Sequence, residues 1–139
     1  MKSQGRVLGV DLGERRIGLA LSDPTRILAT PLSIIERADN RDADHAAILS
    51  IAREHDVNEI VVGWPRSLSG RDGPAARSVR EETESLKAAA GENMVIEMHD
   101  ERFSTAIADD RLRAAKSKRK KSDDAAAAVF LQAYLDGAL

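Results

Sequence analysis

Several features are missing from this sequence, and each absence excludes a class of structure. Cysteine does not occur in the 139 residues, so neither a disulfide nor a cysteine-ligated metal site is available. No apolar run approaches the roughly 18 residues of a membrane span, and the amino-terminal residues lack the apolar segment of a signal peptide. We therefore expect a cytoplasmic protein with no membrane partner.

Aromatic residues and net charge are also low, which limits the ways in which nucleic acid could be recognised. Aromatic residues make up 3% of the chain, too few for base stacking to be the main mode of recognition. The net charge is −2, so any contact with a polyanion must come from a local basic cluster. The length and the 42% hydrophobic content fit one globular domain, residues 1–139.

Hydrophobic periodicity and turn residues divide the chain into alternating elements. Strands are predicted at residues 7–10, 17–21, 27–35, 59–63 and 94–98, and helices at residues 44–55, 75–90, from 104 or 105 to about 115, and 123–136. Pro31 in the third strand indicates an edge position or a bulge. The order predicts an α/β fold with a mixed five-stranded sheet and helices on both faces. Its first three strands form an antiparallel meander, and crossovers join the later strands in parallel.

The segment RVLGVDLGERRIGLALSD (residues 6–23) predicts a hairpin with a carboxylate inside its first strand. Gly13 and Gly18 flank a charged turn between two apolar runs. Burying an unpaired charge costs several kcal/mol, so an aspartate in a central strand is a functional candidate. The alternative is that Asp11 faces solvent at a fraying strand end.

Other carboxylates stand where predicted elements begin or end. Glu101 follows the fifth predicted strand, and Asp123 and Asp124 open the last predicted helix. A few hard oxygen ligands at one sheet edge suit Mg²⁺, and a pair of such ions supports phosphodiester cleavage by water. Each residue also has a structural alternative, since Asp123 is an ordinary helix N-cap and Glu101 could pair with Arg102.

One basic cluster and one arginine-containing loop suit contact with a phosphate backbone. The segment RLRAAKSKRKK (residues 111–121) has seven basic residues and no acidic one, more than a helix carboxyl end explains. Residues 64–74 hold two prolines and two glycines and are predicted as a loop. Its Arg66 and Arg71 suit phosphate contact, unless the loop is only a connector.

The tryptophan and the histidines are interpreted mainly as structural. Trp64 is expected to pack in the protein and not to stack on a base. His45 and His55 are expected at the surface or boundary of the first helix. His99 precedes Asp100 and Glu101, and for it we favour a structural or positioning role over metal ligation.

Four blocks of the sequence together resemble the YqgF/RuvX family of ribonuclease H-like proteins. They are GVDLGERRIGLALSD (residues 9–23), IVVGWPRSLSGRDGP (60–74), HDERFST (99–105) and DDAAAAVFLQAYLD (123–136). The resemblance implies a ribonuclease H-like fold and a nuclease that depends on two Mg²⁺ or Mn²⁺ ions. Family members are associated with processing the 5′ end of precursor 16S rRNA, and some with resolving four-way DNA junctions.

The resemblance also implies which residues form the site. The family's acidic positions fall on Asp11, Glu101 and Asp123, and the adjacent Asp124 is an alternative third ligand. The residues expected to contact nucleic acid are Arg15, Arg16, Arg66, Arg71, Arg102, Lys116, Lys118, Arg119, Lys120 and Lys121.

Several functions follow from this pattern. The favoured one is a nuclease acting on precursor 16S rRNA, since an acidic protein with a single basic cluster suits a narrow, structured target. A Holliday junction resolvase is the alternative, and it would require a homodimer with two-fold symmetry. A non-catalytic RNA-binding factor of ribosome assembly is disfavoured because all three acidic positions are present. An ATPase is disfavoured because 139 residues leave no room for a second lobe.

Overall fold

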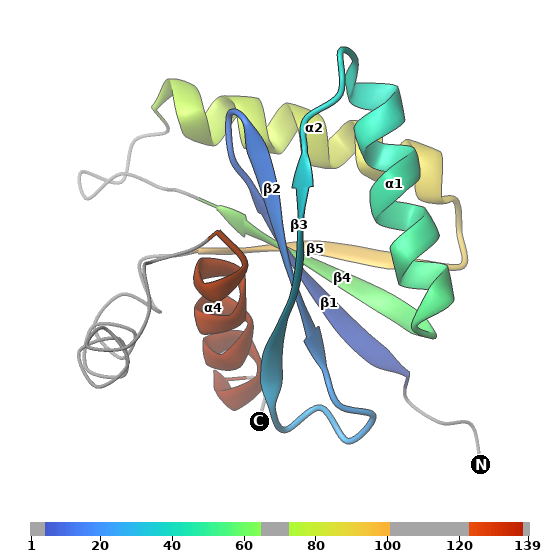
Figure 1. Cartoon of the computed structure of the whole chain (residues 1–139), viewed down its shortest axis with the longest axis vertical. Helices are drawn as coiled ribbons and strands as arrows, with labels where there is room; N and C mark the ends of the chain where they lie inside the picture. Colours follow the sequence, from blue (N-terminus) through green and yellow to red (C-terminus); the bar gives the residue numbers. More distant parts are fainter. Residues whose placement is uncertain (1–4, 65–72, 101–122, 138–139) are drawn as a thin grey trace.

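A five-stranded sheet with helices against both faces forms the centre of the computed structural model, which describes residues 5–64, 73–100 and 123–137 (Figure 1). The strands are β1 (Arg6–Leu12), β2 (Arg16–Ser22), β3 (Ala29–Glu36), β4 (Val57–Trp64) and β5 (Val95–Asp100). The helices described are α1 (Arg41–Glu54), α2 (Pro74–Ala90) and α4 (Asp123–Gly137). None of them is both long and apolar enough to cross a bilayer.

The order of the strands across the sheet is β3-β2-β1-β4-β5. β1 pairs antiparallel with β2, and β2 pairs antiparallel with β3. On its other side β1 pairs parallel with β4, which in turn pairs parallel with β5. The predicted mixed sheet is confirmed, while the helix expected to end near residue 115 lies outside the described residues.

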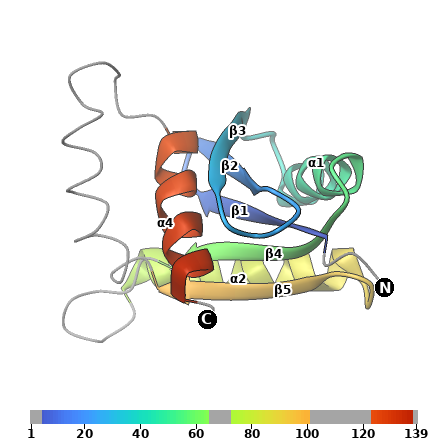
Figure 2. The same cartoon turned by 90° about the horizontal axis from the view of Figure 1, so that it is seen from below.

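Two hydrophobic cores lie on opposite faces of this sheet. α1 and α2 cover one face, and α4 crosses the other (Figure 2). Side chains alternate along β1, because successive residues of a strand point to opposite faces. Leu8 and Val10 pack in the core under α1 and α2, whereas Val7 packs with Phe130 and Leu131 of α4. The same alternation assigns Asp11 to the α4 face.

β3 is an edge strand with an irregular register, as Pro31 indicated. The pairing shifts between Leu19, opposite Ser33, and Ala20, opposite Pro31. A bulge at an edge tolerates proline because no ladder hydrogen bond is lost there. Both expectations for Pro31 are therefore confirmed.

The predicted start of the third strand at residue 27 is wrong. The carboxylate of Asp23 accepts the backbone N–H groups of Ile27 (2.8 Å) and Leu28 (2.9 Å), and these bonds hold a turn in place of a strand. Hydrogen bonds, foremost the one from the Leu28 backbone, hold the pKa of Asp23 well below its usual range. The strand begins only at Ala29.

Two other predicted boundaries shift for local reasons. α1 begins at Arg41 and not at residue 44, because the Asn40 side chain accepts the Ala43 N–H (2.8 Å) and caps the helix. The predicted loop of residues 64–74 is shorter at both ends, since Trp64 closes β4 and Pro74 opens α2. Proline suits the first turn of a helix because that turn does not use its N–H.

α4 lies close to β1 because Gly9 has no side chain at the contact. A Cβ atom added to Gly9 would lie 2.9 Å from Cβ of Leu131 and 3.4 Å from the carbonyl oxygen of Ala127. The four consecutive alanines, residues 125–128, keep the first turns of the helix slim. The distance between α4 and the sheet is therefore set at Gly9.

The carboxyl-terminal half of α4 is held to the sheet by polar side chains. The Gln132 amide accepts the Ala29 N–H (2.9 Å) and donates to the Ile27 carbonyl (2.8 Å). The Tyr134 hydroxyl bonds the Glu59 carboxylate of β4. These contacts fix the rotation and level of the helix on the sheet.

Gly9→Ala is expected to lower the free energy of unfolding by about 1–3 kcal/mol, because overpacking displaces the helix. Urea unfolding at pH 7 measures the change. Gly137→Ala is the matched control, since a Cβ there meets nothing within 4 Å. Equal midpoints for Gly9→Ala and the parent would contradict the close contact.

Candidate functional site

The carboxyl ends of three parallel strands, β1, β4 and β5, meet at one edge of the sheet. Val10 pairs with Val62, and Val62 pairs with Met98, so the strands end at the same level. Asp11 is the next residue of β1. Glu101 follows β5 directly in the sequence and lies outside the described residues.

Asp11 occupies a central strand and is half-buried on the face that α4 covers. Its partner on β2 is Gly18, and the residue that follows Val62 on β4 is Gly63. Because glycine carries no side chain, neither neighbouring strand covers the Asp11 side chain from the side. The fraying-end alternative is wrong, because the hydrogen-bonded ladder with β2 continues through Asp11 to Leu12.

The first turn of α4 comes near this strand end. Gly9 packs against Ala127 and Leu131, and α4 runs roughly opposite to β1 (Figure 1). Two strand residues span about 6.6 Å and one helical turn about 5.4 Å, so Asp11 lies about one turn nearer the amino end of α4. The helix begins at Asp123. The side chains of Asp123 and Asp124 are not among those described.

Of the predicted ligands, only Asp11 has a described side chain. Among the side chains that the structure describes, no three carboxylate or imidazole groups gather as a metal site. The His99 ring packs edge-on against Tyr134 of α4, with ring centroids 5.4 Å apart. That contact fits the structural or positioning role favoured for His99.

Trp64 packs within the protein, as predicted. Its indole Nε1–H donates to the Ala76 carbonyl (3.3 Å), and the Arg80 guanidinium lies 5.0 Å from the ring centroid. These contacts join the end of β4 to the first turns of α2.

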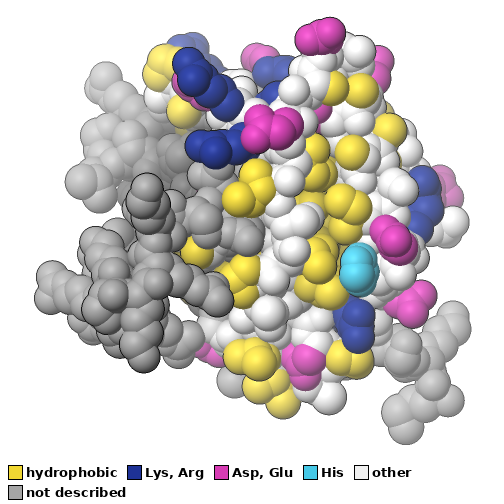
Figure 3. Space-filling model, in the orientation of Figure 1, with side chains coloured by type: hydrophobic (Ala, Val, Ile, Leu, Met, Phe, Trp, Pro, Cys, Tyr) yellow, Lys and Arg dark blue, Asp and Glu magenta, His cyan; other side chains and the backbone are white. Residues whose placement is uncertain are grey.

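The predicted nucleic-acid contacts are described only in part. Arg15 and Arg16 are exposed where the chain turns from β1 into β2. In the space-filling view, basic and acidic side chains gather together along the upper edge of the molecule (Figure 3). The other predicted contacts lie outside the described residues: Arg66, Arg71, Arg102, Lys116, Lys118, Arg119, Lys120 and Lys121.

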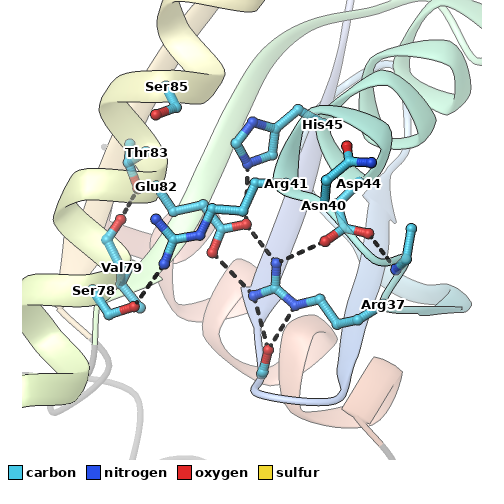
Figure 4. Close-up of polar contacts among 12 residues, drawn as sticks. Arg37, Asn40, Arg41, Asp44, His45, Ser78, Val79, Glu82, Thr83 and Ser85 are labelled. Carbon is cyan, nitrogen blue, oxygen red and sulfur yellow. Dashed lines mark hydrogen bonds and ion pairs between the residues drawn. The ribbon is translucent and has the colours of Figure 1, made fainter.

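A buried charged cluster on the other face of the sheet was not predicted (Figure 4). Arg37, just after β3, bonds the Gly13 carbonyl through Nε (3.0 Å) and Nη2 (2.8 Å). It also bonds Glu82 of α2 through Nη1 (2.5 Å) and Nη2 (3.0 Å), and Asp44 of α1 through Nη1 (3.1 Å). All five N–H donors of the guanidinium are therefore used.

The acidic partners in this cluster are almost fully buried. Glu82 and Asp44 are each 2% exposed, and His45, also 2% exposed, lies 3.0 Å from Glu82 through Nε2. Burial raises the pKa of Glu82, but the hydrogen bonds from Arg37 and His45 and their charges outweigh it and lower the pKa overall. The bond to Glu82 likewise raises the pKa of Arg37.

One feature of the sequence indicates this buried cluster. Glu82 lies on the helical stripe of Val79, Thr83 and Leu86, which all face the core. A charge in such a stripe predicts a buried partner. The expectation that His45 lies at the surface or boundary of the helix is wrong, because Glu82 gives its ring a polar partner inside the protein.

An open hollow of about 760 Å³ lies beside this cluster. Its walls come from the β1–β2 turn, the segment before α1 and the first turns of α2. Arg41 crosses from α1 to bond Ser78 of α2 (3.2 Å) at its border. The hollow is on the α1 and α2 side, away from the face that carries Asp11.

The geometry agrees with a comparison with known proteins. Residues 5–137 match the family RuvX, described as Holliday junction resolvase. The chain belongs to the RuvX family. A protein of Anaeromyxobacter sp. (strain Fw109-5) named "Putative pre-16S rRNA nuclease" is 45% identical over 136 residues, 95% of this chain and 97% of that one. A Fusobacterium nucleatum protein of the same name is 43% identical, over 94% of this chain and 96% of that one.

Solved structures of other proteins have the same fold as this RuvX-family chain. Thermus thermophilus RuvC in complex with a Holliday junction substrate has a TM-score of 0.62 at 15% identity, covering 94% of this chain and 92% of that one. The yeast mitochondrial Holliday junction resolvase Ydc2 has a TM-score of 0.60 at 12% identity, covering 97% and 79%. The fold is that of the RuvC-like, ribonuclease H-like proteins. Family and fold together identify a nuclease, as the sequence predicted.

Glu82→Gln in this RuvX protein is expected to lower the free energy of unfolding by about 3 kcal/mol at pH 7, because Arg37 loses its buried carboxylate partner. The pKa of Glu82 is lower in the folded protein than its ordinary value of 4.5, so the Glu82 carboxylate stabilises the fold fully at pH values above 4.5. This stabilisation is lost as the pH falls through the folded pKa. Urea unfolding from pH 7 to pH 3 measures both effects.

The neighbouring Glu81→Gln is the control, since Glu81 is exposed on the same helix and its stability should change by less than about 0.5 kcal/mol. If the difference between Glu82→Gln and the parent stayed constant down to pH 3, the buried ion pair would not be responsible.

Proposed function

We propose that this RuvX-family nuclease depends on divalent ions and processes the 5′ end of precursor 16S rRNA. Relatives named for that activity are 45% and 43% identical over nearly the whole chain. The observation that carries the site is the position of Asp11. Its carboxylate lies at the end of a central strand, between two glycine positions and near the amino end of α4.

The proposed metal ligands are Asp11, Glu101 and Asp123, with Asp124 as the alternative to Asp123. Carboxylate oxygens are the donors that Mg²⁺ and Mn²⁺ take. Glu97 and His99 of β5 both contact Tyr134 and so face α4, and Glu101 comes two residues after His99 in the sequence. When bound, a pair of ions supplies Lewis acidity and neutralises charge at the phosphate.

Basic residues of the chain would bind the phosphate backbone of the substrate. Arg15 and Arg16, exposed on the turn that follows Asp11, would contact phosphates on either side of the cleaved bond. Arg66, Arg71, Arg102 and residues 116–121 would extend that contact along the strand. Binding should therefore weaken steeply with salt.

A four-way DNA junction is the second candidate substrate. The family description and the titles of the RuvC and Ydc2 structures name Holliday junctions. A junction resolvase would act as a homodimer, with one site for each of two strands. A non-catalytic assembly factor would bind the RNA without cutting it.

Asp11→Asn is expected to reduce the cleavage rate about a hundredfold or more. Substituting a residue that only hydrogen-bonds a metal ligand already lowers metal affinity or activity by about 10–100-fold, and Asp11 is proposed as a ligand itself. The assay offers a precursor 16S rRNA 5′ leader and a synthetic four-way junction side by side, each with Mg²⁺, Mn²⁺ or EDTA. The melting temperature should show that the variant is folded.

Asp39→Asn, the same change at an exposed residue of the β3–α1 connection, is the control and should cleave like the parent. Cleavage by Asp11→Asn at the parent rate would show that the site is wrong. RNA binding with no cleavage at any metal concentration would favour the assembly factor.

A further inference from the structure

Two arginines hold β1, one at each end. Arg26, in the β2–β3 connection, donates from Nε to the Gly5 carbonyl (3.1 Å) just before the strand and pairs with Glu59 (2.7 Å). Arg37 donates to the Gly13 carbonyl just after the strand. The two arginines bind in the same way, because each guanidinium contacts both a backbone carbonyl and a carboxylate. We call the contacts of Arg26 the amino-terminal clamp and those of Arg37 the carboxyl-terminal clamp.

The carboxyl-terminal clamp reaches Asp11 through one residue, Gly13. The Gly13 N–H donates to the Asp11 carbonyl (3.1 Å), and its own carbonyl accepts twice from Arg37. The turn is also tight, since a Cβ on Gly13 would lie 2.5 Å from the Arg16 carbonyl oxygen. A displacement of the Gly13 backbone is therefore passed to the backbone of Asp11.

The position of Arg37 is set by the core and not by an exposed loop. Glu82 comes from α2 and Asp44 from α1, and both are 2% exposed. Asp44 is itself held, because its Oδ1 accepts the Ala38 N–H (2.7 Å). The planar fork of arginine matches a carboxylate in two bonds and loses little freedom when it does so. Three elements thus fix one guanidinium against the turn.

We propose that Arg37, oriented by Glu82 and Asp44, is a positioning residue for the nuclease reaction, which fixes the Gly13 backbone and thereby the carboxylate of Asp11. This role rests on the proposed function of Asp11 as a metal ligand. Positioning matters because a displacement of about 1 Å at a reacting group can cost about 100-fold in rate.

A purely structural role for Arg37 makes a different prediction. Removing the fork would then lower stability without a specific effect on catalysis. Arg26 offers the matched comparison, since its clamp is built alike but holds the end of β1 far from Asp11. Lysine at either position keeps the charge and loses the planar fork.

The experiment compares Arg37→Lys with Arg26→Lys. Both should lower the melting temperature. Only Arg37→Lys should lower kcat, by about tenfold or more, with KM for the nucleic acid within about twofold. It should also weaken Mn²⁺ binding, measured by electron paramagnetic resonance with Asp11→Asn as the reference, by about tenfold. Faster exchange of the Gly13 amide in Arg37→Lys alone, measured by NMR, would report the loosened peptide directly.

The outcomes separate this proposal from the proposed function. Full cleavage by Asp11→Asn would overturn both the proposed role of Asp11 as a metal ligand and this role of Arg37. If Asp11→Asn is inactive but Arg37→Lys keeps the parental kcat and Mn²⁺ binding, only the role of Arg37 is overturned. An equal loss of kcat and of Mn²⁺ binding in Arg26→Lys would also overturn the role of Arg37. If Arg37→Lys does not fold, Glu82→Gln takes its place, because it removes one arm of the clamp and keeps Arg37. The same split between kcat and KM is expected.

Discussion

The contact between α4 and β1 at Gly9 is the constraint on which the rest of this structure depends. Without a side chain at Gly9, the helix lies against the strand at the level of Ala127 and Leu131. Gln132 then fixes the start of β3 to the same helix. Because the helix is rigid and begins one turn beyond this contact, its amino end is brought to the end of β1. A larger residue at position 9 would separate the two elements that the proposed site joins.

Charged groups in the protein interior are tolerated because they are completely paired. Arg37 uses every N–H donor, and its acidic partners come from two helices and lie almost fully buried. An ion pair of this kind adds little net stability over well-packed apolar residues, but it is costly to break because one charge is left buried. What the pairing adds is orientation. It holds the turn after β1 to the helical layer, on the face opposite to α4.

The two faces of the sheet therefore contribute differently to the end of β1. The α1 and α2 face holds the backbone of the β1–β2 turn through a buried network. The α4 face leaves the Asp11 side chain between two glycine positions, without cover from the neighbouring strands. In a nuclease this division suits metal chemistry, because the backbone of a ligand residue must be held rigidly. An acidic chain with local basic segments also limits binding to targets that match those segments.

The sequence alone determined the order of the described elements, the mixed sheet and the edge position of Pro31, because periodicity and proline chemistry are local properties. The role of Asp11, which rests on a charge within an apolar strand, stays a proposal. The sequence alone did not determine the turn that Asp23 holds at Ile27, the cap at Asn40 or the burial of His45. Each of those depends on which side chain meets which backbone group in the folded chain. The pairing of Arg37 with Glu82 joins residues 45 positions apart. Only the tertiary structure decided it, since the cost of burying a charge depends on a partner that the fold, and not the neighbouring sequence, brings into contact.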